Sequence, residues 1–69
     1  MTFGEVVLHY LDALGVSQAE LARRVGTNRS TINCIIKDER RSPTLDTAVA
    51  IADALGVPLD DMVSMMRGE

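Results

Sequence analysis

Four of the seven basic residues of this 69-residue chain lie within fifteen positions, between Thr27 and Arg41. The same stretch contains Ser30 and Asn33, whose side chains both donate and accept hydrogen bonds. Arginine and lysine bind phosphate groups through charge-assisted hydrogen bonds, whereas hydroxyl and amide groups pair with the polar edges of an organic ligand. The stretch is therefore a candidate binding site for an anionic ligand that also offers hydrogen-bonding edges.

The charge of the chain is distributed unevenly along the sequence. Residues 17 to 41 contain six basic and three acidic residues, a formal charge of +3, whereas the remaining residues contain one basic and seven acidic residues, a charge of −6. The pI near 4.9 argues against nucleic-acid binding, because such domains are usually basic. The segregation of charge removes that objection for residues 17 to 41, the segment suited to an anion.

The composition indicates one small globular domain, and we expect residues 1 to 69 to form it. Cys34 is the single cysteine, which excludes an intramolecular disulfide, and His9 is the single histidine, so no metal site is expected. No apolar run approaches the roughly 18 residues of a membrane span, and no signal peptide is recognisable. A cytoplasmic location is therefore expected.

These residues must be positioned by helices, because the hydrophobic periodicity predicts five short helices and no β-strand. The first begins after Thr2 and ends at Gly15. Thr2 and Glu5 have the spacing of a capping box, in which two side chains satisfy backbone amides at the start of a helix. The apolar positions of this helix are Phe3, Val6, Val7, Tyr10, Leu11 and Leu14.

The second and third helices are separated by a short break at Gly26. Ser17 and Glu20 repeat the capping-box spacing at the start of the second helix, and Thr27 and Asn28 are both suitable N-caps for the third. The third helix, residues 29 to 37, has an apolar stripe formed by Ile32, Ile35 and Ile36.

The fourth and fifth helices form the acidic part of the chain. Pro43 and Thr44 begin the fourth helix, whose expected buried positions are Leu45, Ala48, Val49, Ala52 and Leu55. The fifth, residues 59 to 66, has an apolar face of Leu59, Met62, Val63 and Met66. Asp60 and Asp61 lie in its first turn, where the helix dipole favours carboxylates.

The sequence DALGV occurs twice, at residues 12 to 16 and 53 to 57. One interpretation is an internal duplication. We favour another, in which both copies end a helix in the same way, with glycine in the left-handed conformation and an apolar valine folding back on the last turn.

Two short helices joined by a glycine-containing turn are typical of helix-turn-helix DNA binding. Ala22 is expected where the two helices cross, Gly26 in the turn, and Ile32 and Ile35 in the core. If the isoleucines are buried, a rotation of about 100° per residue leaves the opposite face polar. That face carries Ser30, Asn33, Cys34 and Lys37, with Arg29 and Thr31 on its flanks. Such a helix fits the major groove, where base edges offer distinct hydrogen-bonding patterns.

Several segments resemble the Cro/repressor-type (Xre) helix-turn-helix family of bacterial and phage transcriptional regulators. They are SQAELARRVG, the isoleucine positions that follow, SPTLDTAVAIADALGV and LDDM, which together cover about residues 3 to 64. The resemblance implies an all-α, lambda-repressor-like fold, with the helix-turn-helix in the second and third helices. It also implies sequence-specific binding of double-stranded DNA, most often for repression, with no cofactor.

The same resemblance implies roles for individual residues. Gln18 matches a glutamine that donates to a DNA phosphate and braces the third helix. The positions that face base edges are Arg29, Ser30, Asn33 and Cys34, and the other positions that contact phosphates are Asn28, Lys37, Arg40 and Arg41. Family members often have glutamine, suited to adenine, where this chain has Arg29, which suggests guanine.

Other interpretations of these residues stay open. Arg29 is equally suited to a phosphate, and Arg23 and Arg24 are either a solvated face or additional phosphate contacts. Cys34 is either a small contact residue or an oxidation switch. No nucleophile, base and carboxylate can be assembled from the sequence, which predicts that the protein is not an enzyme.

A single helix-turn-helix reads few base pairs, so a homodimer is expected. The candidate contact is the C-terminal helix, through Met62, Val63, Met65 and Met66. The alternative is that this helix closes the core of the monomer, which we expect of Leu59 and Met62 and leave open for Met65 and Met66. The alternative function is an antitoxin-like or accessory module of the same fold that holds a partner protein through the acidic helices.

Overall fold

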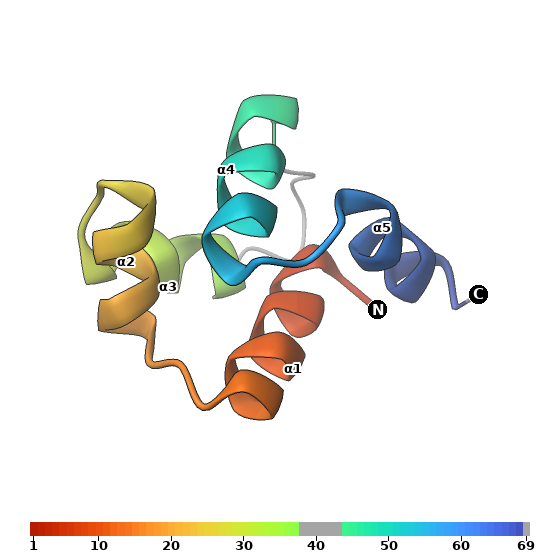
Figure 1. The fold of residues 1–69 in the computed structure, drawn as a ribbon, viewed down its shortest axis with the longest axis horizontal. Coiled ribbons are helices and arrows are strands. Elements are labelled where there is room, and N and C mark those ends of the chain that lie inside the picture. The colour runs from red at the N-terminus through yellow and green to blue at the C-terminus, as the bar shows by residue number, and fades with distance from the viewer. Residues whose placement is uncertain (38–43, 69) are drawn as a thin grey trace.

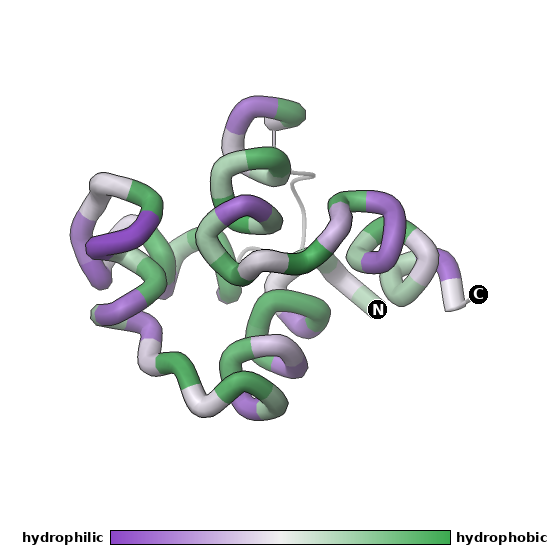
Figure 2. Tube along the Cα trace, in the orientation of Figure 1, coloured by the Kyte–Doolittle hydropathy of each residue, from purple (hydrophilic) through white to green (hydrophobic). Residues whose placement is uncertain are grey.

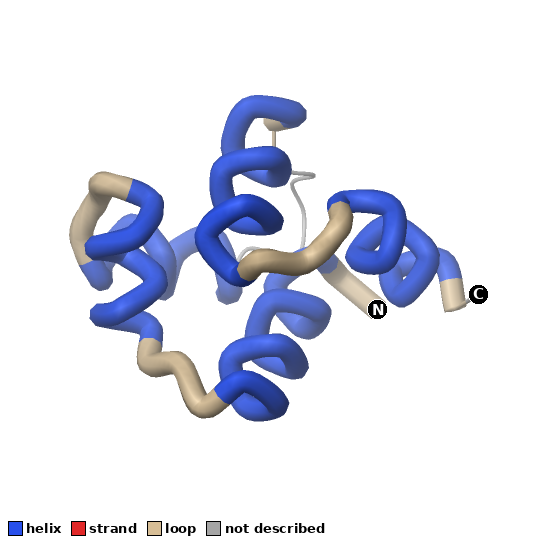
Figure 3. Tube along the Cα trace, in the orientation of Figure 1, coloured by secondary structure: helices blue, strands red, loops and turns tan. Residues whose placement is uncertain are grey.

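The computed structural model describes residues 1–37 and 44–68. Within them the chain forms five helices and no strand (Figures 1 and 3), which confirms the predicted all-α class. The helices are α1 (Phe3–Leu14), α2 (Gln18–Val25), α3 (Arg29–Lys37), α4 (Leu45–Leu55) and α5 (Leu59–Arg67). The last extends one residue beyond the predicted end.

The ends of α1 and α4 follow from their sequences. The capping box at Thr2 is complete, because the Thr2 hydroxyl accepts from the Glu5 amide and the Glu5 carboxylate accepts from the Thr2 amide. These hydrogen bonds stabilise the charged carboxylate and lower the pKa of Glu5. Thr44 caps α4 by accepting from the backbone amide of Thr47.

Both copies of DALGV end a helix in the same way, which confirms the interpretation that we favoured over an internal duplication. Gly15 and Gly56 have φ angles of 67° and 69°, in the left-handed region that glycine adopts without strain. The amide of the following valine then donates to a carbonyl five residues earlier, at 2.9 Å in the first copy and 3.0 Å in the second. This is the Schellman arrangement, and it accounts for the repeated sequence locally.

The capping box predicted at the start of α2 forms only in part. The Ser17 hydroxyl accepts from the Glu20 amide, as expected. The Glu20 carboxylate, however, pairs with Arg23 and Arg24 on the next turn of the same helix. Two nearby guanidinium groups compete for this carboxylate, and α1 has no equivalent groups beside Glu5.

The core lies where the helices converge, and apolar and polar residues alternate along each helix around it (Figure 2). α3 packs against α1 and α2, α4 packs against α2, and α5 packs against α1 and α4. The buried hydrophobic residues are Phe3, Val6, Val7, Leu11, Leu21, Ala22, Ile32, Ala48, Ile51, Ala52, Leu55 and Met62. No polar or charged side chain is buried among the described residues.

The predicted buried face of α4 is wrong at two positions. Leu45 is 70% exposed and Val49 is 39% exposed, whereas Ile51, which the prediction left out, is fully buried. At about 100° per residue the buried stripe is centred between Ile51 and Ala52, and Val49 lies well to one side of it. Leu45 is the first residue of the helix and lines an apolar hollow where α1, α4 and α5 meet. Leu14, in the last turn of α1, is likewise exposed rather than buried.

The predicted dimer contact is also wrong at one position. Met62 has no exposed surface and belongs to the core, so it is not available to a second molecule. Val63, Met65 and Met66 are half-buried. The burial of Met62 agrees with the alternative interpretation, in which Met62 closes the core of the monomer.

No helix among the described residues has both the length and the apolar character needed to cross a membrane.

The orientation of α4 predicts unequal effects on stability for two substitutions that shorten a side chain. Ile51→Val removes one buried methylene and is expected to lower the free energy of unfolding by about 0.5–1.5 kcal/mol. Val49→Ala removes more atoms but acts at the surface, so its effect is expected to stay within about 0.5 kcal/mol. Urea denaturation followed by circular dichroism measures both. A larger loss at position 49 than at position 51 would mean that α4 is rotated about its axis.

Candidate nucleic-acid interface

The turn between α2 and α3 orients the third helix. Gly26 has a φ angle of 86°, and the amides of Gly26 and Thr27 both donate to the carbonyl of Ala22 at 2.9 Å. Of the two predicted N-caps of α3, the structure uses Asn28. Its side-chain oxygen accepts from the backbone amide of Thr31 at 2.9 Å and from the Thr31 hydroxyl at 3.1 Å.

One edge of α3 is anchored in the core. Ile32 is 1% exposed, whereas Ile35 and Ile36 are half-buried and pack against the core from its margin. Ala22 is 3% exposed and small enough for α2 and α3 to approach closely. The predicted stripe is therefore confirmed, with Ile32 as its fully buried member.

The opposite edge of α3 is open to solvent. The candidate contact residues Ser30, Cys34 and Lys37 are exposed there, and Arg29 and Thr31 are exposed on its flanks. Asn33 is half-buried and lies at the border between the exposed and packed edges. The structure thus brings the four predicted base-reading residues onto one short helix, with Asn33 the least accessible of them.

The charges of α3 lie at its two ends. Arg29 is its first residue and Lys37 its last, about 12 Å apart at the helical rise. A cation at the N-terminus of a helix is unfavourable, because the amide dipoles already place positive charge there, and α3 has no acidic residue in its first turn. An anion, or a hydrogen-bond acceptor on a base edge, bound at this end would offset the repulsion between Arg29 and the helix dipole. The position of Arg29 therefore favours a ligand of that kind.

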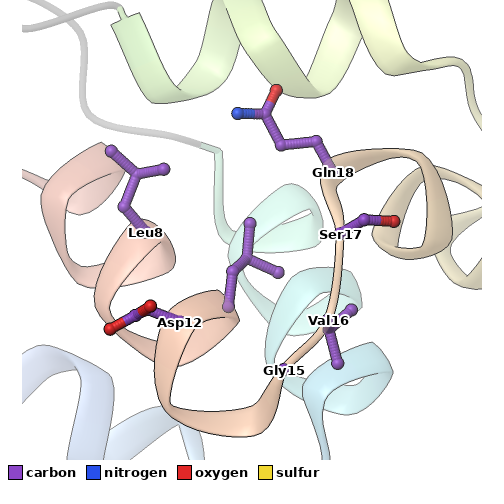
Figure 4. Close-up of a pocket in the computed structure, with 7 residues that line it drawn as sticks. Leu8, Asp12, Gly15, Val16, Ser17 and Gln18 are labelled. Atoms are coloured by element: carbon purple, nitrogen blue, oxygen red, sulfur yellow. The ribbon is translucent and has the colours of Figure 1, made fainter.

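Gln18 lies at the start of α2 and is half-buried. Figure 4 shows its side chain extending from α2 toward α3, at the rim of a hollow of about 480 Å³ between α1 and α2. The hollow is lined by Leu8, Leu11, Asp12, Gly15, Val16, Ser17 and Gln18.

The other predicted residues divide between two cases. Arg40 and Arg41 lie outside the described residues. Asn28 uses its side-chain oxygen as the cap of α3, and the NH₂ group of the same amide can still donate to a phosphate. Its capping role and its predicted phosphate contact are therefore compatible.

Arg24 has a structural contact that sequence reasoning missed. Its guanidinium group donates to the Glu20 carboxylate and to the backbone carbonyl of Ala54, each at 3.2 Å. The carbonyl belongs to the last turn of α4, which lacks partners within the helix and favours positive charge. Arg24 therefore ties the helix-turn-helix to α4. The Glu20–Arg24 spacing of four residues predicts the ion pair, but nothing local predicts the bond to Ala54.

His9 is exposed and stacks edge-on against the neighbouring Tyr10. Within residues 1–37 and 44–68, no three His, Cys, Asp or Glu side chains are grouped so as to hold a metal ion.

Comparison with known proteins agrees with this geometry. The model of the helix-turn-helix family matches residues 9–62, most of the chain. The chain belongs to the Cro/C1-type helix-turn-helix family. It is a DNA-binding transcriptional regulator. Among curated protein sequences, none matches the chain significantly.

A solved structure supports the same assignment. The high-resolution crystal structure of the restriction-modification controller protein C.AhdI from Aeromonas hydrophila is similar to this regulator, with a TM-score of 0.77 and 27% sequence identity. The similarity covers 87% of this chain and 89% of the controller protein. The likeness therefore extends over most of both chains.

The two roles of Asn28 predict different effects for two substitutions. Asn28→Ala removes the cap and is expected to lower the free energy of unfolding by about 0.5–2 kcal/mol. Asn28→Asp keeps a capping oxygen, so stability should remain near that of the wild type. It replaces the NH₂ donor with negative charge, however, and should weaken DNA binding.

Urea denaturation measures the stability of the two variants, and fluorescence anisotropy with a labelled duplex measures their affinity. If the Asn28→Asp variant binds DNA as tightly as the wild type, Asn28 acts only as the cap of α3 and does not contact a phosphate.

Proposed function

We propose that this regulator binds a specific double-stranded operator with α3 in the major groove and thereby represses transcription. The observation that carries the proposal is the two-sided character of α3. Ile32 anchors one edge in the core, while Ser30 and Cys34 are exposed on the other and Arg29 is exposed at the N-terminal end. A helix held in this way can enter the groove without losing its packing, and its exposed side chains can reach base edges.

The candidate contact residues divide by their chemistry. We assign base reading to Arg29, Ser30, Asn33 and Cys34, with Arg29 bidentate to the O6 and N7 atoms of guanine. We assign phosphate contacts to Gln18, Asn28, Lys37, Arg40 and Arg41. Phosphate contacts position the protein on the duplex, and base contacts specify the sequence.

Repression then follows from occupancy, because a protein on the operator excludes the polymerase. We propose that the 69 residues act as one domain, in the cytoplasm, without a cofactor and without enzymatic activity. The similarity to a restriction-modification controller, which covers 87% of this chain, supports a regulatory role for the helix-turn-helix domain.

We further propose that two copies bind together, reading half-sites about 34 Å apart along one face of the duplex. The contact surface we assign is an apolar hollow of about 280 Å³ where α1, α4 and α5 meet. It is lined by Phe3, Leu45, Ala48, Leu59, Met62, Val63 and Met66. Leu45 stands at its edge with 70% of its surface exposed, and the buried Met62 forms only its floor.

Two substitutions test the division into base and phosphate contacts. Binding sequences are first selected from a random duplex pool with the wild type, and we expect a two-fold symmetric motif with a guanine in each half. Arg29→Ala should then lose about 1–3 kcal/mol of binding free energy and relax the preference at one base pair. Lys37→Ala should weaken all sequences alike and reduce the salt dependence.

The selection from the random duplex pool is repeated with each variant, and the affinity of each variant for the selected duplex is measured at increasing salt concentration. Loss of affinity in both variants with unchanged base preference would contradict the assignment of Arg29. Enrichment of no sequence by the wild type would favour the alternative function, an accessory module that binds a partner protein.

Leu45→Glu tests the proposed dimer surface. A carboxylate at the edge of the apolar hollow should abolish self-association, because it would be buried without a partner. Leu14→Glu is the matched control. Leu14 is also an exposed leucine, but it lies at the end of α1, on the opposite side of the molecule from the start of α4 (Figure 1). Sedimentation equilibrium should show a monomer only for Leu45→Glu, and a persistent dimer would place the contact elsewhere.

A further inference from the structure

The first turn of α1 and the last turn of α3 approach each other backbone to backbone. Gly4 is the second residue of α1 and is buried. A β-carbon built on Gly4 would lie 2.7 Å from the carbonyl carbon of Ile36 and 2.8 Å from its Cα, and still closer to its carbonyl oxygen. Contacts this short do not occur in folded proteins, so only glycine allows the observed separation.

Glycine has a cost at this position. Within a helix it is less favourable than alanine, because its backbone loses more freedom on folding. Gly4 has ordinary helical geometry and does not need a left-handed conformation. The close approach to Ile36 therefore explains why this position is glycine, since the backbone conformation of α1 does not require one.

The contact falls on the half of α3 that carries part of the candidate reading face. Ile36 is next to Lys37, and Asn33 and Cys34 lie within the preceding turn. On the other side α1 is firmly held, because Phe3, Val6 and Val7 are buried and the capping box closes its first turn. α1 is thus a fixed surface against which the C-terminal half of α3 rests.

We propose that Gly4 is a positioning residue for DNA recognition. Its lack of a side chain lets the C-terminal half of α3 lie directly on α1, which sets the tilt of α3 and the base edges that Asn33 and Cys34 reach. Arg29, at the far end of α3, is held instead by the α2–α3 turn and the Asn28 cap. This inference rests on the proposed function of α3 as the reading helix.

Gly4→Ala tests the inference. The added methyl group must push the C-terminal end of α3 away from α1. We expect the ratio of operator affinity to non-specific affinity to fall roughly tenfold, the loss of about one good base contact. Repeated selection should show weakened preference at the base pairs assigned to Asn33 and Cys34, with the guanine assigned to Arg29 retained.

Gly56→Ala is the matched control. Gly56 has a φ of 69° and open space where a β-carbon would lie, so alanine there strains the backbone without displacing α3. It should lower the melting temperature and leave the affinity ratio unchanged. Both variants are compared at a temperature where circular dichroism shows them folded. If Gly4→Ala does not fold in buffer, trimethylamine N-oxide is added to all three proteins to restore the fold.

The outcomes separate the two proposals. An operator selected by the wild type, together with an unchanged affinity ratio and base preference in Gly4→Ala, would overturn the role of Gly4 and leave the proposed function intact. Failure of the wild type to select any sequence would overturn both. A ratio that falls in Gly4→Ala but not in Gly56→Ala supports the positioning role, because a general loss of stability would affect the two variants alike.

Discussion

The burial of one edge of α3 is the interaction on which the rest of the structure depends. α3 packs against α1 and α2, and Ile32 belongs to the same core cluster as Leu21 and Ala22 of α2, all with almost no exposed surface. A chain of 69 residues buries a limited apolar area, so this packing must both stabilise the domain and hold α3, the helix that we propose reads DNA. Because the same helix does both, its polar edge stays open without weakening the core.

The charged residues fall into structural and functional groups once the contacts are known. Arg23 and Arg24 lie on α2 and pair with Glu20, and Arg24 also bonds the end of α4. Arg29 and Lys37 lie at the two ends of α3, where the placement of Arg29 opposes the helix dipole. This separation explains how a chain of pI near 4.9 serves a polyanion, since the acidic residues of α4 and α5 lie in other elements.

Much of the architecture was predictable because its signals are local. Capping residues and left-handed glycines act within one turn, so they located the helix ends to within one residue. The apolar stripe of α3 and the polar face opposite it also follow from helical periodicity alone. Periodicity failed at Leu45 and Val49, because it reports that a residue is apolar but not whether a neighbouring helix covers it.

The sequence by itself determined the five helices, the helix-turn-helix and the residue types on the exposed edge of α3, because hydrogen bonding and periodicity within each helix decide them. Only the tertiary structure decided which apolar residues are buried, that Arg24 reaches Ala54, and that Gly4 meets Ile36. These contacts join residues about 30 positions apart, and they depend on how far and at what angle the helices pack. No short-range pattern in the sequence carries that information.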